Sequence, residues 1–527
     1  MFTDRHQQLW QAGRALSFAA AVLAGVLVSA TCCIAQDAPV SDAPAEAQTP
    51  GCEGLDARGC LDRATEAMGG REKLASISTE QLDVIGHTEL MEQSYRQAPF
   101  ITSYTRALIT VDYAGQRIVR KEHAVWPESD LKQADSDSTL IVTPAGGVVR
   151  SGSQDFPSDA ASLNAAREAL ALGPERILLT AAAAKDLHYA PAETLRTTAH
   201  TVLAFALNGI PVRLLVNRFN HLPDAVETTQ EFGDFWFYWG DVEQRVYFEN
   251  WRWIDGLEYP SNQVTERNGA VWSSTQAVDI VLNKPVDDKD FALDAKAAAS
   301  SPRTGWKAAV FHAGQDKSLA DGIDLFLGSW NTTIVKQADG VVILETPISG
   351  SFTEGILAEA KKRYPGAPVK AVLSTSDSWP HVGGLRFDVA QGLPVYILDL
   401  NETLLERMLT APHKIDPDTL ETAKRAPQWK IVAGRTEVGT GANRMVLFPL
   451  RGGSTERQYM VYFPERKLLY ASDTLVVNDD HTLYDPELFH EVEQAVEREH
   501  LVVDTVYAMH QAPVTWSEVL TMLRKTA

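Results

Sequence analysis

The sequence predicts an α+β protein of two domains, an antiparallel β domain followed by a domain in which strands and helices alternate. Three observations lead to this prediction. The chain has 527 residues, more than a single hydrophobic core usually supports. Asn-Gly and Asp-Gly pairs separate short strand-like runs in the first half. In the second half, strand-like and helix-like segments follow one another, which is typical of helices packed on sheets.

The composition is that of a folded protein and excludes one class of partner. Hydrophobic residues make up 45% of the chain and charged residues 22%, as in ordinary globular proteins. The net charge of −21 argues against nucleic acid, because phosphate binding needs clustered Lys and Arg side chains. The same charge argues against a surface that adheres to anionic lipid.

The N-terminus has the pattern of a secretory signal. Arg5 and Arg14 precede an uncharged apolar run at residues 15–30, which is short for a membrane span and is followed by small residues. We expect residues 1–35 to be a signal peptide and the mature protein to be exported, to the periplasm or the cell exterior. An uncleaved anchor is the alternative, and it would be the only contact with a membrane.

Residues 36–51 predict a flexible tether, because Ala, Pro, Asp and Gln leave almost nothing to bury. Once the signal is removed, Cys52 and Cys60 are the only cysteines. In an oxidising compartment such a pair predicts a disulfide, worth about 2–3 kcal/mol for so short a loop. Two free thiols are the alternative. A structural zinc site is not expected, since it takes four ligands.

The first domain, residues 52–294, reads as an antiparallel sheet with added helices. A helical pattern at residues 55–68 ends at Gly69-Gly70. Strands are expected at residues 103–113, 116–125 and 139–149, and in hairpins around Asn208-Gly209, Asp255-Gly256 and Asn268-Gly269. A helix is expected at residues 159–172, with a second one after Gly173-Pro174.

Residues 235–239 form an aromatic run, Phe-Trp-Phe-Tyr-Trp, with two interpretations. As a strand it would carry large rings on both faces. One interpretation is an apolar concave face that holds an acyl chain or docks a partner. The other, which we favour, is a strand buried on both sides, because aromatic side chains dominate protein cores.

Two further stretches of this domain resemble a known fold. Residues 251–260 read Trp-Arg-Trp-Ile-Asp-Gly-Leu-Glu-Tyr-Pro, and residues 281–288 read Val-Leu-Asn-Lys-Pro-Val-Asp-Asp shortly before Phe291. They resemble the curved half-barrels of the lipoprotein-carrier type (LolA/LolB-like). The resemblance implies an antiparallel β half-barrel for the first domain.

Residues 295–305, rich in Ala and Ser, predict an interdomain linker. The second domain, residues 306–527, then alternates between strand and helix. The pattern predicts strands at residues 341–344, 369–373 and 394–398, an amphipathic helix at 351–364, and a short helix after Gly383-Gly384. Pro365-Gly366 ends the amphipathic helix.

Four stretches of this domain occur in the order of a known superfamily. They are residues 341–347 (Val-Val-Ile-Leu-Glu-Thr-Pro), 383–386 (Gly-Gly-Leu-Arg), 462–473 (ending Tyr-Ala-Ser-Asp) and 509–516 (Met-His-Gln-Ala-Pro-Val-Thr-Trp). The second of these closes the loop of residues 374–384, Ser-Thr-Ser-Asp-Ser-Trp-Pro-His-Val-Gly-Gly. Together they resemble the metallo-β-lactamase superfamily, whose metal loop reads Thr-His-x-His-x-Asp-His-x-x-Gly. The resemblance implies an αββα sandwich over residues 323–520.

An intact member of that superfamily holds two adjacent metal ions, and this chain keeps part of one site. The resemblance places the ligands of the first ion at Ser376, Ser378 and Ser454, and those of the second at Pro380, His381, Asp473 and His510. Serine hydroxyls are poor zinc ligands beside imidazole or carboxylate, and proline supplies none. His381, Asp473 and His510 therefore remain as candidate metal ligands.

Two histidines and one carboxylate can hold a single zinc or iron ion. We therefore expect a divergent hydrolase with at most one metal ion, acting on a small-molecule or lipid substrate. The alternative is a metal-free, catalytically inactive protein that binds a lipid or a protein in the cell envelope. A serine mechanism at Ser376 or Ser378, with Asp377 and His381, is disfavoured because the sequence has no nucleophile elbow.

Overall fold

The computed structural model describes residues 51–91, 100–125, 135–300, 305–314 and 316–526. The expected signal peptide and all but the last residue of the expected tether lie outside the described residues. No helix within the described ranges is long and apolar enough to cross a membrane.

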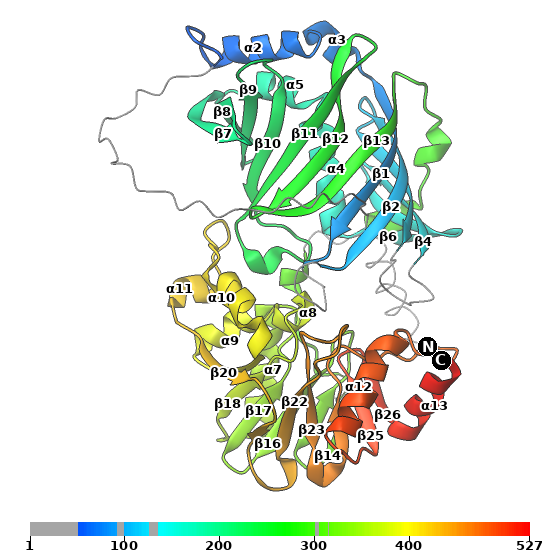
Figure 1. Ribbon diagram of the computed structural model, residues 1–527, viewed down its shortest axis with the longest axis vertical. Coiled ribbons are helices and arrows are strands. Elements are labelled where there is room, and N and C mark those ends of the chain that lie inside the picture. The colour runs from blue at the N-terminus through cyan, green and yellow to red at the C-terminus, as the bar shows by residue number, and fades with distance from the viewer. Residues whose placement is uncertain (1–50, 92–99, 126–134, 301–304, 315, 527) are drawn as a thin grey trace, which may run out of the picture.

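The first half of the chain forms one antiparallel sheet, in the order β6-β5-β4-β3-β2-β1-β13-β12-β11-β10-β9-β8-β7 (Figure 1). Its strands are β1 (Thr79–Glu89), β2 (Thr102–Asp112), β3 (Arg117–Val125), β4 (Ser136–Thr143), β5 (Gly146–Ser151), β6 (Gln154–Pro157), β7 (His188–Leu195), β8 (Thr198–Leu207), β9 (Ile210–Asn217), β10 (Pro223–Gln230), β11 (Val242–Ile254), β12 (Leu257–Arg267) and β13 (Ala270–Leu282). Most neighbouring strands are also consecutive in the chain. Pairing of β1 with β13 joins the first and the last strand of this half within the sheet.

The predicted hairpin turns are confirmed. Asn208, Asp255 and Asn268 have φ angles of 52°, 52° and 48°, and the glycine that follows each of them also has a positive φ. This is the backbone conformation that two-residue hairpin turns require. The β8–β9, β11–β12 and β12–β13 hairpins were therefore predictable from local sequence.

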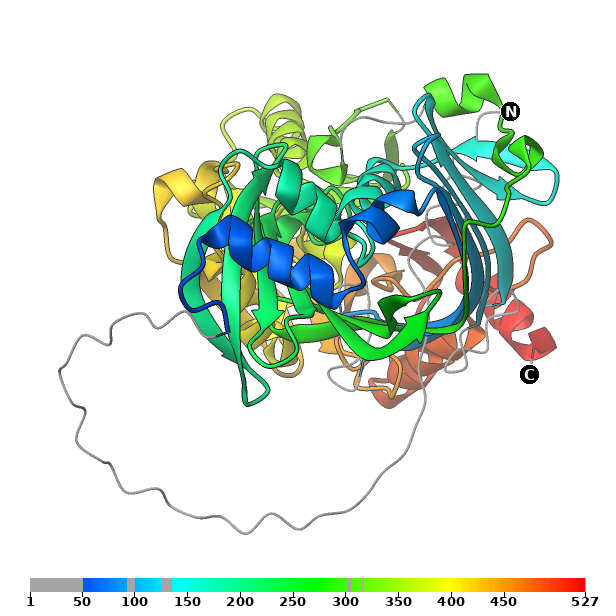
Figure 2. The same ribbon diagram turned by 90° about the horizontal axis from the view of Figure 1, so that it is seen from above.

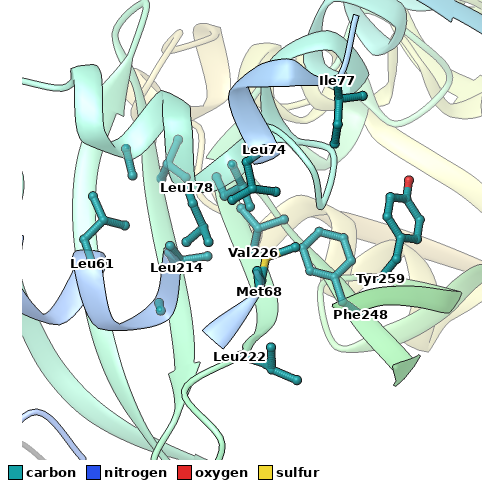
Figure 3. Packing of buried hydrophobic residues seen from close by; sticks show 14 of the residues in the cluster. Leu61, Met68, Leu74, Ile77, Leu178, Leu214, Leu222, Val226, Phe248 and Tyr259 are labelled. Atoms are coloured by element: carbon teal, nitrogen blue, oxygen red, sulfur yellow. The ribbon is translucent and has the colours of Figure 1, made fainter. Parts of the chain in front are cut away.

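Helices cover one end and the concave side of this curved sheet (Figure 2). They are α2 (Ala57–Ala67), α3 (Arg71–Ser76), α4 (Ala160–Leu172) and α5 (Ile177–Ala183). Helix α6 (Ala295–Ala299) packs on the opposite, convex face, where Ala298 lies in one cluster with Val119, Ile141 and Val148. Helices α2 and α3 lie across the end of the sheet, where Leu61, Met68 and Leu74 pack against Leu214 and Phe248 (Figure 3). A disulfide joins Cys52 to Cys60, with Cα atoms 5.4 Å apart, and fixes the start of α2 to the segment before it.

Two local predictions for this half are wrong, and a third segment, expected to be a linker, contains a short helix. Residues 139–149 form the β4–β5 hairpin rather than one strand. Residues 235–239 form a turn and the 3-10 helix η1 (Phe237–Trp239), not a strand, and their rings are buried against the second half of the chain. Ala295–Ala299, expected within a linker, forms α6, which Asp294 caps through the backbone N–H groups of Lys296 and Ala297.

The second half contains two mixed sheets (Figure 1). The seven-stranded sheet consists of β14 (Asp316–Ala320), β15 (Ile323–Phe326), β16 (Thr332–Gln337), β17 (Gly340–Leu344), β18 (Val369–Leu373), β19 (Pro394–Leu398) and β20 (Gln428–Val432), in that order. The six-stranded sheet consists of β21 (Thr436–Val438), β22 (Met445–Pro449), β23 (Tyr459–Phe463), β24 (Leu468–Tyr470), β25 (Thr505–Ala508) and β26 (Gln511–Thr515). Strands β17 to β20 are parallel, and so are β24 and β25.

The helices of this half are α7 (Gly350–Arg363), α8 (Trp379–Val382), α9 (Leu385–Gln391), α10 (Glu402–Thr410), α11 (Thr419–Ala423), α12 (Pro486–Arg498) and α13 (Trp516–Thr526). The predicted strands at residues 341–344, 369–373 and 394–398 and the predicted helix at 351–364 correspond to β17, β18, β19 and α7 within a residue or so.

Alternating side chains show how the layers stack. In β17, Val341 and Ile343 pack on the side of α7 and α9, whereas Val342 and Leu344 face the other sheet. In the six-stranded sheet, Leu447 of β22 faces the seven-stranded sheet. The adjacent residues Val446 and Phe448 point the other way and pack with α12 and α13. The second half is therefore a helix–sheet–sheet–helix sandwich.

The aromatic run of residues 235–239 joins the two halves. Its rings belong to the same buried cluster as Ile356 of α7, Trp379 of α8 and Leu385 of α9. Next to this cluster, the carboxylate of Asp241 accepts hydrogen bonds from the backbone N–H groups of Lys414 and Ile415, at 2.9 and 3.0 Å. The run is thus a docking element between the two halves.

Candidate functional site

The candidate site lies at one edge of the sandwich, where strands of both sheets end. Glu345 directly follows β17, and the loop of residues 374–378 follows β18. Asp473 follows β24, and His510 lies in the turn between β25 and β26. Loops beyond the carboxyl ends of parallel strands are where α/β sheets usually bind ligands, because neighbouring strands deliver their loops to the same place. The fold thus brings together residues far apart in the sequence.

Glu345 is a fully buried carboxylate in a constrained conformation. Its φ of 69° is unusual for a residue with a side chain, so the surrounding contacts must hold it in place. Its Oε1 accepts hydrogen bonds from the Tyr470 hydroxyl at 3.2 Å, from the Thr375 backbone N–H at 3.2 Å and from the Thr375 hydroxyl. These bonds leave its Oε2 directed at His381.

His381 lies in the single turn of α8 and is fully buried. Its Nδ1 is 3.1 Å from Glu345 Oε2, and its Nε2 is 4.0 Å from Asp473 Oδ2. The first contact has the distance of a hydrogen bond but not its angle, and neither ring nitrogen forms a hydrogen bond with the described residues. Burial alone lowers the pKa of His381, but the charges of Glu345, Asp473 and Asp377 outweigh it and raise the pKa.

His510 is held more firmly. Its Nδ1 is 2.6 Å from the backbone carbonyl oxygen of Ser329, and its Nε2 is 3.2 Å from Asp473 Oδ1. A carbonyl oxygen only accepts hydrogen bonds, so Nδ1 carries the proton and Nε2 of the neutral ring is an acceptor. An acceptor this close to a carboxylate requires a proton or a cation between them. Asp473 therefore lies between two imidazoles that both turn Nε2 toward it.

The donor atoms of His381, Asp473 and His510 are of the types that bind one metal ion, although His381 lies too far from Asp473 to share an ion with it at these distances. Within the part of the chain that the structure describes, no group of three or more His, Cys, Asp or Glu side chains converges closely enough to hold a metal ion. Ligands of a tetrahedral zinc lie about 3.3 Å apart, given bonds of about 2.0–2.1 Å. The contact between His510 and Asp473 has nearly that length, and the one between His381 and Asp473 would have to shorten by about 0.7 Å.

The remaining positions at which the resemblance places metal ligands make other contacts. Ser376 Oγ accepts a hydrogen bond from the Ser378 backbone N–H at 3.2 Å. Ser454 is bound to two carboxylates of α12, through its N–H to Glu491 at 2.9 Å and through its hydroxyl to Glu487 at 3.0 Å. The carbonyl oxygen of Pro380 accepts from the backbone N–H of Ile348 at 2.8 Å.

Sequence reasoning missed a buried ion pair behind the loop. Arg457 and Asp377 are both almost completely buried, and Arg457 Nε donates to Asp377 Oδ2 at 2.7 Å. The ring nitrogens of His381 lie against Glu345 and Asp473, not Asp377, so these residues do not form a serine triad. The only sequence signal was that Asp377 lies in an otherwise uncharged loop. Its partner is distant in sequence and becomes visible only in the fold.

Aromatic rings from both halves surround the site. Trp330 packs edge-on against His510, with ring centroids 6.5 Å apart, and against Trp379 at 5.9 Å. Phe235, from the first half of the chain, stacks on Trp379 at 4.3 Å, and Trp306 contacts Trp330 and Trp379 at 5.2 and 5.4 Å. The docking element of residues 235–239 thus contacts Trp379, which lies two residues before His381.

Neither a protein-family model nor a curated protein matches this sequence. Among solved structures, DIM-1 metallo-β-lactamase aligns at 16% identity and a TM-score of 0.32, covering 40% of this chain and 98% of its own. A metallo-β-lactamase from Pontibacter korlensis aligns at 17% identity and a TM-score of 0.31, with the same coverage. The stereoselective inverting sec-alkylsulfatase Pisa1 from Pseudomonas sp. aligns at 15% identity and a TM-score of 0.30, over 40% of each chain.

Proposed function

We propose that the second half of the chain is a divergent metallo-hydrolase whose site holds one zinc or iron ion at His381, Asp473 and His510. One observation carries the proposal: both imidazoles place Nδ1 against an oxygen atom and turn Nε2 toward the same carboxylate. Histidines that bind metals usually have their other ring nitrogen fixed in this way by a carboxylate or a carbonyl.

The protein residues would divide the work as follows. Glu345 and the Ser329 carbonyl set the orientation of the two imidazoles, and Asp473 contributes the negative charge that favours a cation. When bound, the ion supplies Lewis acidity toward a carbonyl, phosphoryl or similar oxygen. The three serines offer no ligands for a second ion, and Pro380 adds none to the retained set, so the proposal is limited to one ion with three protein ligands.

Metal content of the full-length mature protein tests the proposal, measured by elemental mass spectrometry after expression in the native compartment. We expect about one equivalent of zinc or iron in the wild type. We expect an at least tenfold loss of metal affinity in His381→Ala, His510→Ala and Asp473→Asn, because each removes a ligand. His490→Ala, at a more exposed histidine on α12, is the matched control and should retain the metal. A metal-free wild type with native circular dichroism would contradict the proposal.

A metal-free, catalytically inactive protein is the second candidate, and one observation favours it. A proton on the His510 ring satisfies the contact with Asp473 as well as a cation does. The same elemental analysis separates the two candidates. If the wild type is folded and contains no metal, the second half is better described as a binding module, for an envelope lipid or protein.

We also propose that the protein is exported and that its first half, residues 52–294, is a half-barrel of the lipoprotein-carrier type. The disulfide between Cys52 and Cys60 supports export, because such bonds persist in oxidising compartments. The curved sheet with α4 on its concave side supports the half-barrel. N-terminal sequencing of the mature protein should find a start near residue 36, whereas an intact Met1 would contradict cleavage.

A further inference from the structure

The loop of residues 374–378 is held in place by residues at the start of β23, in the six-stranded sheet. All five residues of the loop are buried. Arg457 Nε donates a hydrogen bond to Asp377 Oδ2 at 2.7 Å, and Arg457 Nη2 donates to the same oxygen. The backbone N–H of Tyr459 donates to the Thr375 carbonyl at 3.0 Å. The loop is therefore fixed to the other sheet at two points.

The same segment also contacts one of the candidate metal ligands. Gln458, the residue after Arg457, accepts a hydrogen bond through its side-chain Oε1 from the backbone N–H of Asp473, at 3.1 Å. The loop itself leads directly into α8, which carries His381. Residues 457–459 thus hold both the loop before His381 and the backbone of Asp473. The separation of these two side chains decides whether they can share one ion.

Arg457 is in turn held by its own surroundings. Its carbonyl oxygen accepts a hydrogen bond from the side-chain amide of Asn401 at 3.0 Å. Two residues earlier, the Thr455 hydroxyl donates to Glu491 of α12 at 2.7 Å. Asn401 and Thr455 are both almost completely buried. Supporting contacts of this kind keep the geometry of a site within the narrow limits that ligand binding requires.

Stability alone does not explain an ion pair in this place. The side chains of Arg457 and Asp377 are 1% and 0% exposed. Removing both charges from water costs about as much free energy as their pairing returns, and apolar residues of similar volume often give an equally stable core. An apolar pair does not provide direction, whereas a guanidinium fork fixes the position of the carboxylate that it binds. The pair therefore serves the geometry of the loop.

We propose that Arg457 is a positioning residue for the candidate metal site, which acts through Asp377 to hold the loop, and with it His381, close to Asp473. Arg457 is not a ligand in this scheme, because a guanidinium group has only hydrogen-bond donors. The link to metal binding rests on the proposed function. The fixing of the loop does not, because its contacts are formed by protein atoms alone.

The double variant Asp377→Leu/Arg457→Met tests the proposal in the full mature chain, because it replaces the ion pair by apolar side chains of similar size. We expect it to fold with a thermal midpoint close to that of the wild type. In the metal-free proteins, hydrogen exchange followed by mass spectrometry should be at least tenfold faster in residues 374–384 and unchanged in the rest of the sandwich. Wild-type exchange in this loop, or faster exchange throughout the sandwich, would overturn the proposal.

Zinc affinity, measured by competition with a chromophoric chelator, is the second readout. We expect it to fall at least tenfold in the double variant, because the support of His381 is lost. Arg150→Met/Asp155→Leu is the control, since it removes a two-bond Arg–Asp pair on the β5–β6 hairpin, and both readouts should stay unchanged. If the wild type and the double variant bind zinc equally well, the proposal fails. If the wild type binds none, the proposed function fails, and exchange of the loop alone decides whether Arg457 positions it.

Arg457→Lys covers the case in which the double variant does not fold. It keeps a cation beside Asp377 but replaces the rigid fork by a single flexible ammonium group. We expect exchange in residues 374–384 to be at least threefold faster than in the wild type, with the rest of the sandwich unchanged. Equal exchange in the two proteins would show that a charge suffices without the fork, and would overturn the positioning role.

Discussion

At the scale of single residues, buried carboxylates determine what the candidate site can do. Glu345 and Asp473 face the two nitrogens of His381, and Asp473 also faces His510. Two imidazoles and two carboxylates in a largely buried place need a proton or a cation to balance them. The two candidate functions differ in whether a metal ion or a proton supplies this positive charge. The occupant of the space between Asp473 and the two imidazoles therefore decides the function.

Asp388 is another buried carboxylate near the site, and a prediction about stability follows from it. Burial raises the pKa of Asp388 to about 8, although a hydrogen bond from Thr346 acts in the opposite direction. In the unfolded chain this group ionises near pH 4. Between about pH 4 and pH 8 the folded protein therefore keeps a proton that the unfolded chain has released, and stability falls as the pH rises.

Asp388→Asn should remove this dependence, because the amide does not titrate. We expect the wild type to lose stability relative to Asp388→Asn from pH 5 to pH 8, as measured by the difference between their thermal midpoints at each pH. A constant difference across this range would show that Asp388 is ionised in the folded protein.

Single residues also show where sequence reasoning stops. His381, Asp473 and His510 could be named from motifs, and the structure places them next to one another, while their role as metal ligands stays a prediction. The Ser329 carbonyl and Arg457 could not be named. A backbone carbonyl has no residue signature, and the partner of Asp377 is set by tertiary packing alone.

At the scale of elements, the local sequence was sufficient to predict those elements whose conformation depends mainly on local backbone energy. The hairpins at Asn208-Gly209 and Asp255-Gly256 were predictable because few other residues adopt a positive φ cheaply. The aromatic run of residues 235–239 was not, because its strand propensity is overridden by burial against the second half. Residues with a high strand propensity form a strand only where the tertiary structure provides a neighbouring strand to pair with.

The disulfide at the start of α2 makes a prediction at this scale. Replacing both Cys52 and Cys60 by serine should lower the free energy of unfolding of the first half by about 2.5 kcal/mol, the loop-closure value for so short a loop. Both sulfurs are buried beside Leu61, so some loss of packing adds to this effect. Urea denaturation followed by circular dichroism measures it, and an unchanged midpoint would show that the disulfide contributes nothing to stability.

At the scale of the whole molecule, the two halves share one hydrophobic cluster. Phe235 and Trp306 line a cavity of the first half and also pack on Trp379 beside the candidate site. Lys307 adds ion pairs to Glu231 of the first half and to Asp416 of the second. Interfaces of this kind usually couple the unfolding of the two domains they join.

Asp241 offers a way to test that coupling without disturbing either core. Its carboxylate accepts two backbone N–H groups of the second half, and its own N–H donates to the Pro412 carbonyl at 2.8 Å. Asp241→Ala removes the first two bonds, which are partly solvent-exposed and worth roughly 1–2 kcal/mol together. We expect the variant to unfold in two calorimetric transitions where the wild type unfolds in one, and to be cleaved faster by protease near residue 414. Asp62→Ala, at an exposed ion pair far from this contact, should behave as the wild type. If Asp241→Ala still unfolds in a single transition, the aromatic cluster alone holds the two halves together.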